Sequence, residues 1–307
     1  MNVDHIFSPA RVPGLKRVLI AGANGQIGWE LQRTAPENVD VVALDSSSLD
    51  IRDENQVYKL FRELSPEVVI NAAAYTAVDK AEQEPELAYA VNATGAGYLA
   101  EACHNLSARF IHISTDFVFD GVQSKPYLPD DLPNPIGVYG ASKLEGERLV
   151  TELTQGKALI LRSAWVYSTH GHNFVKTMLR LLKEGDEIKV VVDQIGTPTC
   201  ANGLAQAIWR TFELPQMQGL FHWTDAGVAS WYDFAIAIQD IGIELGLIDH
   251  VAAIIPISSA NYVASANRPQ CSILNSDSTE DMVGVKREYW RLALRRMIID
   301  LISRAGR

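Results

Sequence analysis

The sequence predicts an α/β protein with a doubly wound parallel sheet and a smaller C-terminal α/β domain. Short apolar runs alternate with helical patterns through the first half of the chain, at the spacing of βα units. A glycine-rich turn follows the first run, and the alternation weakens after Trp165. Parallel strands bring their carboxyl ends to one edge of a sheet, so we expect the chemistry at that edge.

Five strands are predicted in the first half, each a short run of mainly apolar residues. Between the second and third, apolar residues recur at helical spacing over residues 57–64, and Asp53 is the expected N-cap of that helix. Pro85 is expected to begin a longer helix that runs to about residue 105. The predicted strands cover residues 17–21, 39–44, 68–70, 110–113 and 158–161.

The second half has a less regular pattern and is predicted to form most of a substrate-binding domain. The expected helices cover 174–183, 204–212, 231–245 and a stretch after 287, with a strand at 188–192. The predicted division is an N-terminal extension over 1–15, a cofactor domain over 16–167 and a mainly substrate-binding part over 168–307, with segments of 190–220 returning to the cofactor domain.

Composition and charge limit the class of protein. The 307 residues are 47% hydrophobic and 21% charged, which is typical of a chain with a full core and a solvated surface. A net charge of −10 without a basic run argues against nucleic-acid binding. No apolar run suits a membrane span or a signal peptide. Cys103, Cys200 and Cys271 lack the spacing of a disulfide framework or a zinc site, so we expect a soluble cytoplasmic protein.

The first motif is a glycine turn between a strand and a helix. Gly22, Gly25 and Gly28 form a GxxGxxG pattern directly after the strand at 17–21. Such a turn lets a pyrophosphate approach backbone N–H groups at a helix N-terminus. The pattern alone also fits a tight turn without a ligand. Asp45 closes the second strand about 20 residues on, where a carboxylate binds ribose hydroxyls, and this context predicts a Rossmann-type dinucleotide site.

The second motif places Tyr139 and Lys143 four residues apart, on one face of a helix. Alone, such a pair is more often a surface feature. In an active site, an ammonium about 4 Å from a phenol, at an effective dielectric of about 20, contributes roughly 4 kcal/mol. That is enough to lower the phenol pKa from about 10 to near 7, so that tyrosine can donate a proton.

The third motif is Ser114-Thr115-Asp116, immediately after the fourth strand. A hydroxyl at this carboxyl edge can hydrogen-bond a substrate carbonyl, although the tripeptide alone is more often a turn or a cap. The order of the three motifs makes a chance combination improbable. Together they predict a reductase that uses NADPH or NADH.

These motifs resemble the extended short-chain dehydrogenase/reductase superfamily, and further stretches resemble its dTDP-4-dehydrorhamnose reductase family. The resemblance spans about residues 16 to 305. It implies reduction of the C4 keto group of a nucleotide sugar, dTDP-4-dehydro-L-rhamnose, to dTDP-L-rhamnose. The matching stretches are 25–31, 71–79, 114–119, 162–167, 268–269 and 274–275.

The resemblance also assigns residues to roles. It implies that Tyr139 donates the proton with Lys143 as its partner, and that Thr115 is also catalytic. Residues implied to contact the cofactor are Gly22, Gly25, Gln26, Ile27, Gly28, Asp45, Asp50, Ile51, Ala74, Tyr75, Thr76, Tyr139 and Lys143. Residues implied to contact the substrate are Thr115, Asp116, Trp165 over the sugar, and Arg268 at the diphosphate.

Other functions on the same scaffold stay open. Some family members hold magnesium between subunits with glutamates; Glu30 matches one of them, but Asn202 stands in place of another, so no metal is expected. A dehydratase would carry a second acid at Phe117, which weakens that alternative. An epimerase and a non-catalytic regulatory subunit of the same fold are further alternatives. We expect a nucleotide-sugar ligand and a homodimer, and neither nucleic acid nor membrane as a partner.

Overall fold

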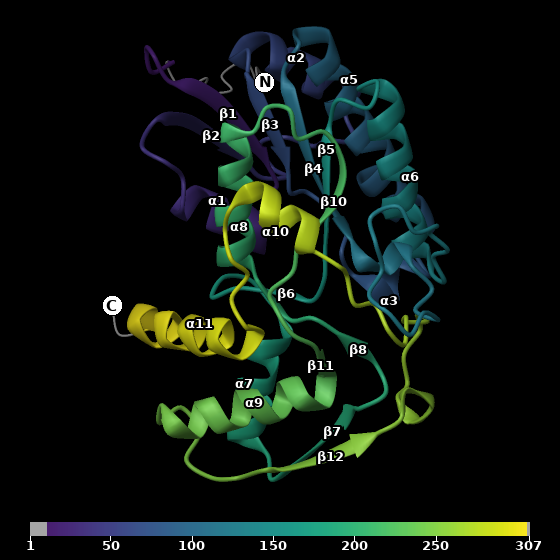
Figure 1. The fold of residues 1–307 in the computed structure, drawn as a ribbon, viewed down its shortest axis with the longest axis vertical. Helices are drawn as coiled ribbons and strands as arrows, with labels where there is room; N and C mark the ends of the chain where they lie inside the picture. Colours follow the sequence, from purple (N-terminus) through teal and green to yellow (C-terminus); the bar gives the residue numbers. More distant parts are fainter. Residues whose placement is uncertain (1–10, 306–307) are drawn as a thin grey trace, which may run out of the picture.

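A six-stranded parallel sheet forms the centre of the computed structural model, which describes residues 11–305 (Figure 1). The strand order is β10-β5-β4-β3-β1-β2, and every neighbouring pair is parallel. This confirms the predicted doubly wound fold. Most of the predicted N-terminal extension lies outside the described residues. The strands are β1 (Lys16–Ala21), β2 (Val39–Leu44), β3 (Val68–Asn71), β4 (Arg109–Thr115), β5 (Leu159–Ser163) and β10 (Gly219–His222).

Helices cover both faces of the sheet, because alternate strand residues point to opposite sides. Leu19 of β1 packs in an apolar cluster with the helices on one face, and Ile20 packs in a second cluster on the other face. Burial on both sides explains why the strands are nearly continuous apolar runs. The first face carries α2 (Glu54–Leu64), α5 (Ala96–Leu106) and α6 (Val138–Leu153), and the second carries α1 (Gln26–Arg33) and α8 (Ala201–Arg210).

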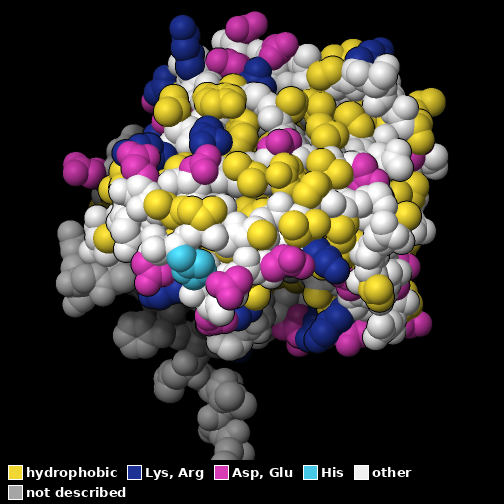
Figure 2. Space-filling view, turned by 90° about the horizontal axis from the view of Figure 1, so that it is seen from below, with side chains coloured by type: hydrophobic (Ala, Val, Ile, Leu, Met, Phe, Trp, Pro, Cys, Tyr) yellow, Lys and Arg dark blue, Asp and Glu magenta, His cyan; other side chains and the backbone are white. Residues whose placement is uncertain are grey.

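Most of the chain after Tyr167 forms a second layer, drawn below the sheet in Figure 1. Its own apolar core includes Phe234, Ile238 and Leu294. On its lower face Figure 2 shows many hydrophobic side chains. Its main elements are α7 (Phe174–Glu184), β7 (Glu187–Val191), α9 (Trp231–Glu244), β12 (Ala253–Ile257) and α11 (Trp290–Ala305). Across residues 11–305, no helix has the length and apolar character that crossing a membrane requires.

The chain returns to the sheet after this layer has begun. α8 packs on α1, and β10 pairs with β5 to complete the sheet edge. α8 begins three residues earlier than the helix predicted at 204–212, and a short 3₁₀ turn, Thr211–Glu213, follows it. The sequence predicted that segments of residues 190–220 return to the cofactor domain, but it did not predict β10 as a strand. The exact domain boundaries stay a prediction.

The long helix predicted from Pro85 is interrupted by a π-helical turn. α4 (Pro85–Tyr89) is followed by the π turn Ala90–Gly95 and then by α5. At this turn α6 comes so close that a Cβ on Gly146 would lie 2.1 Å from the carbonyl oxygen of Asn92. The extra residue in the turn therefore lies where two backbones meet, which the apolar spacing of the sequence does not reveal.

A buried ion pair joins α6 to β5. Glu147 accepts two hydrogen bonds from Arg162, at 2.9 and 2.7 Å, and the side chains are 6% and 2% exposed. Ser114 also donates to Glu147, so the carboxylate is well satisfied. The guanidinium lies 4.9 Å from the ring centroid of Phe119. Such a pair fixes α6 on the sheet, since breaking it would leave an uncompensated buried charge.

Glu147→Gln should therefore lower the free energy of unfolding by about 3 to 5 kcal/mol, because Arg162 stays buried without its counter-charge. Urea denaturation followed by circular dichroism measures this change. Glu152→Gln is the matched control on the same helix: its ion pair with Arg148 is exposed, so little change is expected. Equal, small effects of the two substitutions would contradict a structural role for the buried pair.

Candidate active site

The glycine turn lies between β1 and α1, as predicted. Gly22 has φ +87°, and a Cβ there would lie 2.6 Å from the backbone nitrogen of Ala73. A Cβ on Gly28 would lie 2.1 Å from the carbonyl oxygen of Gly22. No side chain among the described residues caps α1 at Gly25, so backbone N–H groups remain available at the positive end of this helix. The turn therefore fits the pyrophosphate of a dinucleotide.

Asp45 lies at the end of β2, beside this turn. Its carboxylate accepts hydrogen bonds from the hydroxyls of Ser47 and Ser48, at 2.7 and 3.0 Å, and from the Asn24 amide at 2.6 Å. The hydrogen bonds from Ser47 and Ser48 lower the pKa of Asp45, so it is ionised at neutral pH. Its negative charge is positioned for hydroxyl donors such as those of a ribose.

Asp50 and Ile51, which the family resemblance implies contact the cofactor, follow β2. Asp50 is paired with Arg52 at 2.6 Å, and hydrogen bonds from Arg52 lower the pKa of Asp50. Ile51 is buried. Arg52 is therefore engaged in this structure, and its charge is held by a neighbouring carboxylate.

Asn92 connects the loop after β3 to α6, a role that the sequence did not predict. Its amide accepts from the Tyr75 backbone N–H at 2.8 Å and donates to the Tyr75 carbonyl at 3.1 Å. It also donates to the Ser142 hydroxyl at 3.0 Å. The loop from Ala74 to Thr76 is thereby tied to the helix that carries Tyr139. A buried Asn inside a helical pattern gave no local signal of this function.

Tyr139, Thr115 and Asp116 lie together at the carboxyl edge of the sheet. The Thr115 side chain lies close enough to the Tyr139 phenol to lower its pKa, and Thr115 donates to Asp116 Oδ1 at 3.1 Å. α6 reaches this edge closely, because a Cβ on Gly140 would lie 2.1 Å from the carbonyl oxygen of Phe117. The structure thus brings together residues from two of the predicted motifs.

The expected charge pairing of Lys143 with Tyr139 is not found. The Lys143 ammonium is buried and donates to the carbonyl oxygen of Ile113 at 2.7 Å. Burial lowers the pKa of Lys143 to about 8, although Glu147 opposes the shift. Burial also raises the pKa of Tyr139 to about 12, with the Thr115 side chain acting in the other direction. The expectation of a phenol pKa near 7 was therefore wrong, because desolvation dominates.

Trp165 and Arg268, the two remaining residues implied to contact the substrate, each interact with another side chain of this chain. Trp165 lies just beyond β5 and stacks on Trp231, with ring centroids 3.5 Å apart. Arg268 pairs with Asp79 of α3 (Val78–Ala81) at 2.6 Å, and this lowers the pKa of Asp79. Arg268 is therefore held by a carboxylate here, and a diphosphate would have to compete with Asp79 for it.

Glu30 is surrounded by hydrogen-bond donors. Its carboxylate accepts from Ser168 at 3.0 Å, from Asn202 at 3.0 Å and from Arg33 at 2.9 Å. Within residues 11–305, no group of three or more His, Cys, Asp or Glu side chains is arranged to hold a metal ion. The expectation that no metal is required stays a prediction.

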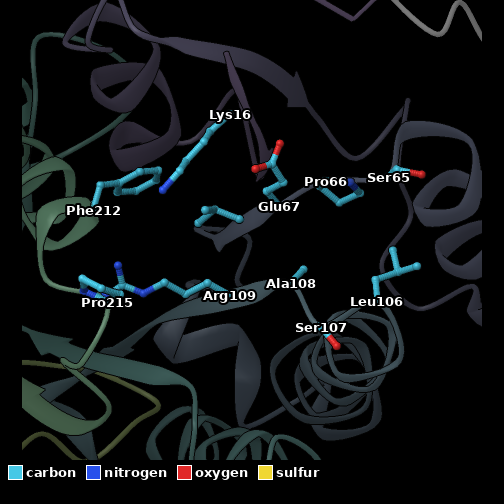
Figure 3. Close-up of a pocket in the computed structure, with 11 residues that line it drawn as sticks. Lys16, Ser65, Pro66, Glu67, Leu106, Ser107, Ala108, Arg109, Phe212 and Pro215 are labelled. Carbon is cyan, nitrogen blue, oxygen red and sulfur yellow. The ribbon is translucent and has the colours of Figure 1, made fainter. Parts of the chain in front are cut away.

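A cavity of about 410 Å³ lies at the opposite edge of the sheet (Figure 3). Its lining includes Lys16, Val68 and Arg109, which are the first residues of β1, β3 and β4. The donors of Arg109 are directed to backbone carbonyl groups of Thr211 and Leu214. This cavity is separated from the Thr115 edge by the length of the strands, so we do not assign the chemistry to it.

Comparison with known proteins gives consistent matches. A model of the RmlD substrate binding domain family matches residues 16–303. The dTDP-4-dehydrorhamnose reductase of Aggregatibacter actinomycetemcomitans is 41% identical over 288 residues, covering 92% of this chain and 98% of that protein. The crystal structure of dTDP-4-dehydrorhamnose reductase from Bacillus anthracis, in complex with NADP, is 39% identical with a TM-score of 0.86, covering 93% and 99% of the two chains.

A more distant structure shares the fold alone. The UDP-glucose 4-epimerase of Thermus thermophilus, in complex with NAD, is 19% identical to this chain with a TM-score of 0.78. The match covers 93% of this chain and 98% of the epimerase. The two layers described above therefore occur together in both proteins.

The carboxyl group of Asp116 tests whether side chains at the carboxyl edge of the sheet are desolvated. Burial raises its pKa from 3.8 to about 6, with hydrogen bonds from Ser272 and Thr115 opposing the shift. The folded state then binds a proton more tightly than the unfolded state, so the contribution to stability is present at low pH and is lost as pH rises through about 6. Relative to Asp116→Asn, the wild-type free energy of unfolding should fall by about 2 kcal/mol between about pH 4 and pH 7.

Denaturation of the two proteins at several pH values measures this difference, and groups that titrate in both cancel. A constant difference across the range would mean that Asp116 is not desolvated.

Proposed function

Because this chain belongs to the dTDP-4-dehydrorhamnose reductase family, we propose that it reduces the C4 carbonyl of dTDP-4-dehydro-L-rhamnose to give dTDP-L-rhamnose. The chain is an oxidoreductase, and NADPH or NADH supplies the hydride when bound. The observation that carries the proposal is the proximity of the Tyr139 phenol and the Thr115 side chain at the carboxyl edge that also holds the glycine turn.

The cofactor would be held by the first half of the chain. Backbone N–H groups from Gly25 to Ile27 would bind the pyrophosphate at the uncapped start of α1. Asp45 would accept hydrogen bonds from the ribose, and the loop from Ala74 to Thr76 would contact the inner part of the dinucleotide. These roles follow from the chemistry of the groups and the family resemblance.

Tyr139 would donate the proton. Its phenol is protonated at neutral pH, and burial, which raises its pKa to about 12, makes it a weak acid until nearby charge stabilises the tyrosinate. As negative charge develops on the carbonyl oxygen, the phenol proton moves to that oxygen while Thr115 offers a hydrogen bond. Lys143, one turn along the same helix, carries positive charge that would stabilise the tyrosinate left behind.

The sugar would be held by groups around this pair. Asp116 Oδ2 is buried and has no hydrogen-bond partner among residues 11–305, so it is suited to accept a bond from a sugar hydroxyl. Trp165 would cover the sugar with its ring face. Arg268 would bind the diphosphate after exchanging Asp79 for phosphate oxygens.

Two alternatives are separated by a single experiment. Oxidation of NADPH and NADH is followed with a panel of nucleotide-linked keto sugars, including dTDP-4-dehydro-L-rhamnose, and the products are identified. A dehydratase or epimerase would give a product without net cofactor oxidation, and a regulatory subunit would bind nucleotide without turnover. Phe117 at the position of the dehydratase acid, and the intact Thr115, Tyr139 and Lys143 set, favour the reductase.

Tyr139→Phe should lower kcat by a factor on the order of 100 to 10,000, because it removes the proton donor. The ring and its edge contact with Phe117 remain, so folding and cofactor binding should be retained. Steady-state kinetics with the keto sugar, with cofactor affinity measured in parallel, test this. Full turnover by the variant would remove Tyr139 from the mechanism.

NADH should serve at least as well as NADPH, because Asp45 is ionised and would repel a 2′-phosphate. Arg52, which could offset that charge, is engaged with Asp50. The ratio of kcat/KM for the two cofactors measures the preference, and Asp45→Ala should shift it toward NADPH. A wild-type preference for NADPH of more than about tenfold would mean that Asp45 points away from the ribose.

A further inference from the structure

The backbone of Trp165 adopts a conformation that a large side chain rarely takes. Its φ is +47°, in the left-handed region, and it is one of few non-glycine residues with positive φ in the described chain. This conformation is strained and persists only where the surroundings impose it. The residue lies two positions after β5, the neighbour of β4 at the edge that carries Thr115. The contacts that impose this conformation therefore decide where the indole lies.

Trp231 supplies one of these contacts. The two indoles are parallel within 5°, with centroids 3.5 Å apart. Trp231 is itself firmly placed, because it is the first residue of α9 and follows a capping box. In that box the Ser230 hydroxyl accepts from Asp233 N at 3.0 Å, and the Asp233 carboxylate accepts from Ser230 N at 2.9 Å. Phe174 packs on Trp231 as well, with centroids 4.7 Å apart.

Gly196 supplies the second contact. It lies in β8 (Ile195–Gly196), which pairs with β11 (Ala229–Ser230), directly before Trp231. A Cβ on Gly196 would lie 2.6 Å from Cε2 and 2.7 Å from Nε1 of Trp165. The indole therefore rests against bare backbone here, and Trp231 and Gly196 together fix its position.

We propose that Trp231 is a positioning residue that, with Gly196, holds the Trp165 indole where it covers the sugar ring of the substrate. This inference rests on the proposed function, and it concerns how tightly the keto sugar is held. Trp231 belongs to the C-terminal layer, and among the described residues its ring packs against Trp165, Phe174 and Phe234. Its loss should therefore act on sugar binding and leave cofactor binding and proton transfer intact.

The test compares three variants with the wild-type enzyme. Trp231→Leu removes the stacking partner, and Trp231→Phe restores an aromatic ring. Tyr232→Leu is the matched control, because it removes the adjacent ring of α9 and leaves the indole pair in place. We expect Trp231→Leu to raise KM for the keto sugar about tenfold with KM for the cofactor unchanged, and Trp231→Phe to recover most of the loss. Tyr232→Leu should behave as wild type.

Circular dichroism supplies a readout that does not depend on activity. The two stacked indoles contribute to the near-ultraviolet signal, so Trp231→Leu and Trp165→Phe should each change it. Thermal unfolding checks that each variant is folded.

Gly196→Ala provides a second route to the same site. Its added Cβ must displace the Trp165 ring while both indoles remain, so the near-ultraviolet signal should change and KM for the sugar should rise. Unchanged sugar KM in folded Trp231→Leu and Gly196→Ala would overturn the inference. A wild-type enzyme that does not turn over the keto sugar would instead overturn the proposed function, and the inference with it.

Discussion

The site depends on three places where a helix approaches another backbone so closely that only glycine fits. At Gly28, Gly140 and Gly146, a Cβ would lie 2.1 Å from a carbonyl oxygen of the facing segment. The first contact closes α1 on the turn that begins at Gly22, and the second brings α6 to the segment after Thr115. The third seats α6 on the π turn. The distance between cofactor turn and proton donor is therefore set by backbone contacts, which cannot adjust as side chains do.

Burial of side chains governs the protonation of the site. Tyr139, Lys143 and Asp116 all have pKa values shifted by burial toward their neutral forms. The Lys143 ammonium keeps a backbone carbonyl as its partner, so it does not lower the pKa of the phenol. A phenol that is protonated before the reaction is what an acid requires. Stabilisation of tyrosinate is needed only once the proton has moved.

The sequence predicted the features that local patterns encode. The strands of the first half, the helices of the C-terminal layer and the N-cap at Asp53, which accepts from Gln56 N, all appear where expected. The glycine turn and the association of Thr115 with Tyr139 were also predictable, because strand ends share one edge of a parallel sheet. The roles assigned to single residues at the cofactor and the sugar remain proposals.

What the sequence could not give are contacts between segments far apart in the chain. Asn92 forms hydrogen bonds with Tyr75 and Ser142. Lys143 donates a hydrogen bond to the carbonyl oxygen of Ile113, whereas the sequence had predicted a pairing with Tyr139. β10 is a short strand whose assignment depends on pairing with β5, which its own four residues do not specify. Long-range partners of this kind depend on packing and burial, and a single sequence carries no local period for them.

The two layers support the site with different degrees of constraint. Tyr139 and Thr115 lie on an α-helix and a sheet strand that are locked by glycine contacts and by the buried Glu147–Arg162 pair. Trp165 instead depends on a strained backbone and on a stack with a residue of the C-terminal layer. A substitution that moves Trp165 should therefore leave in place the backbone contacts that hold Tyr139 and Thr115.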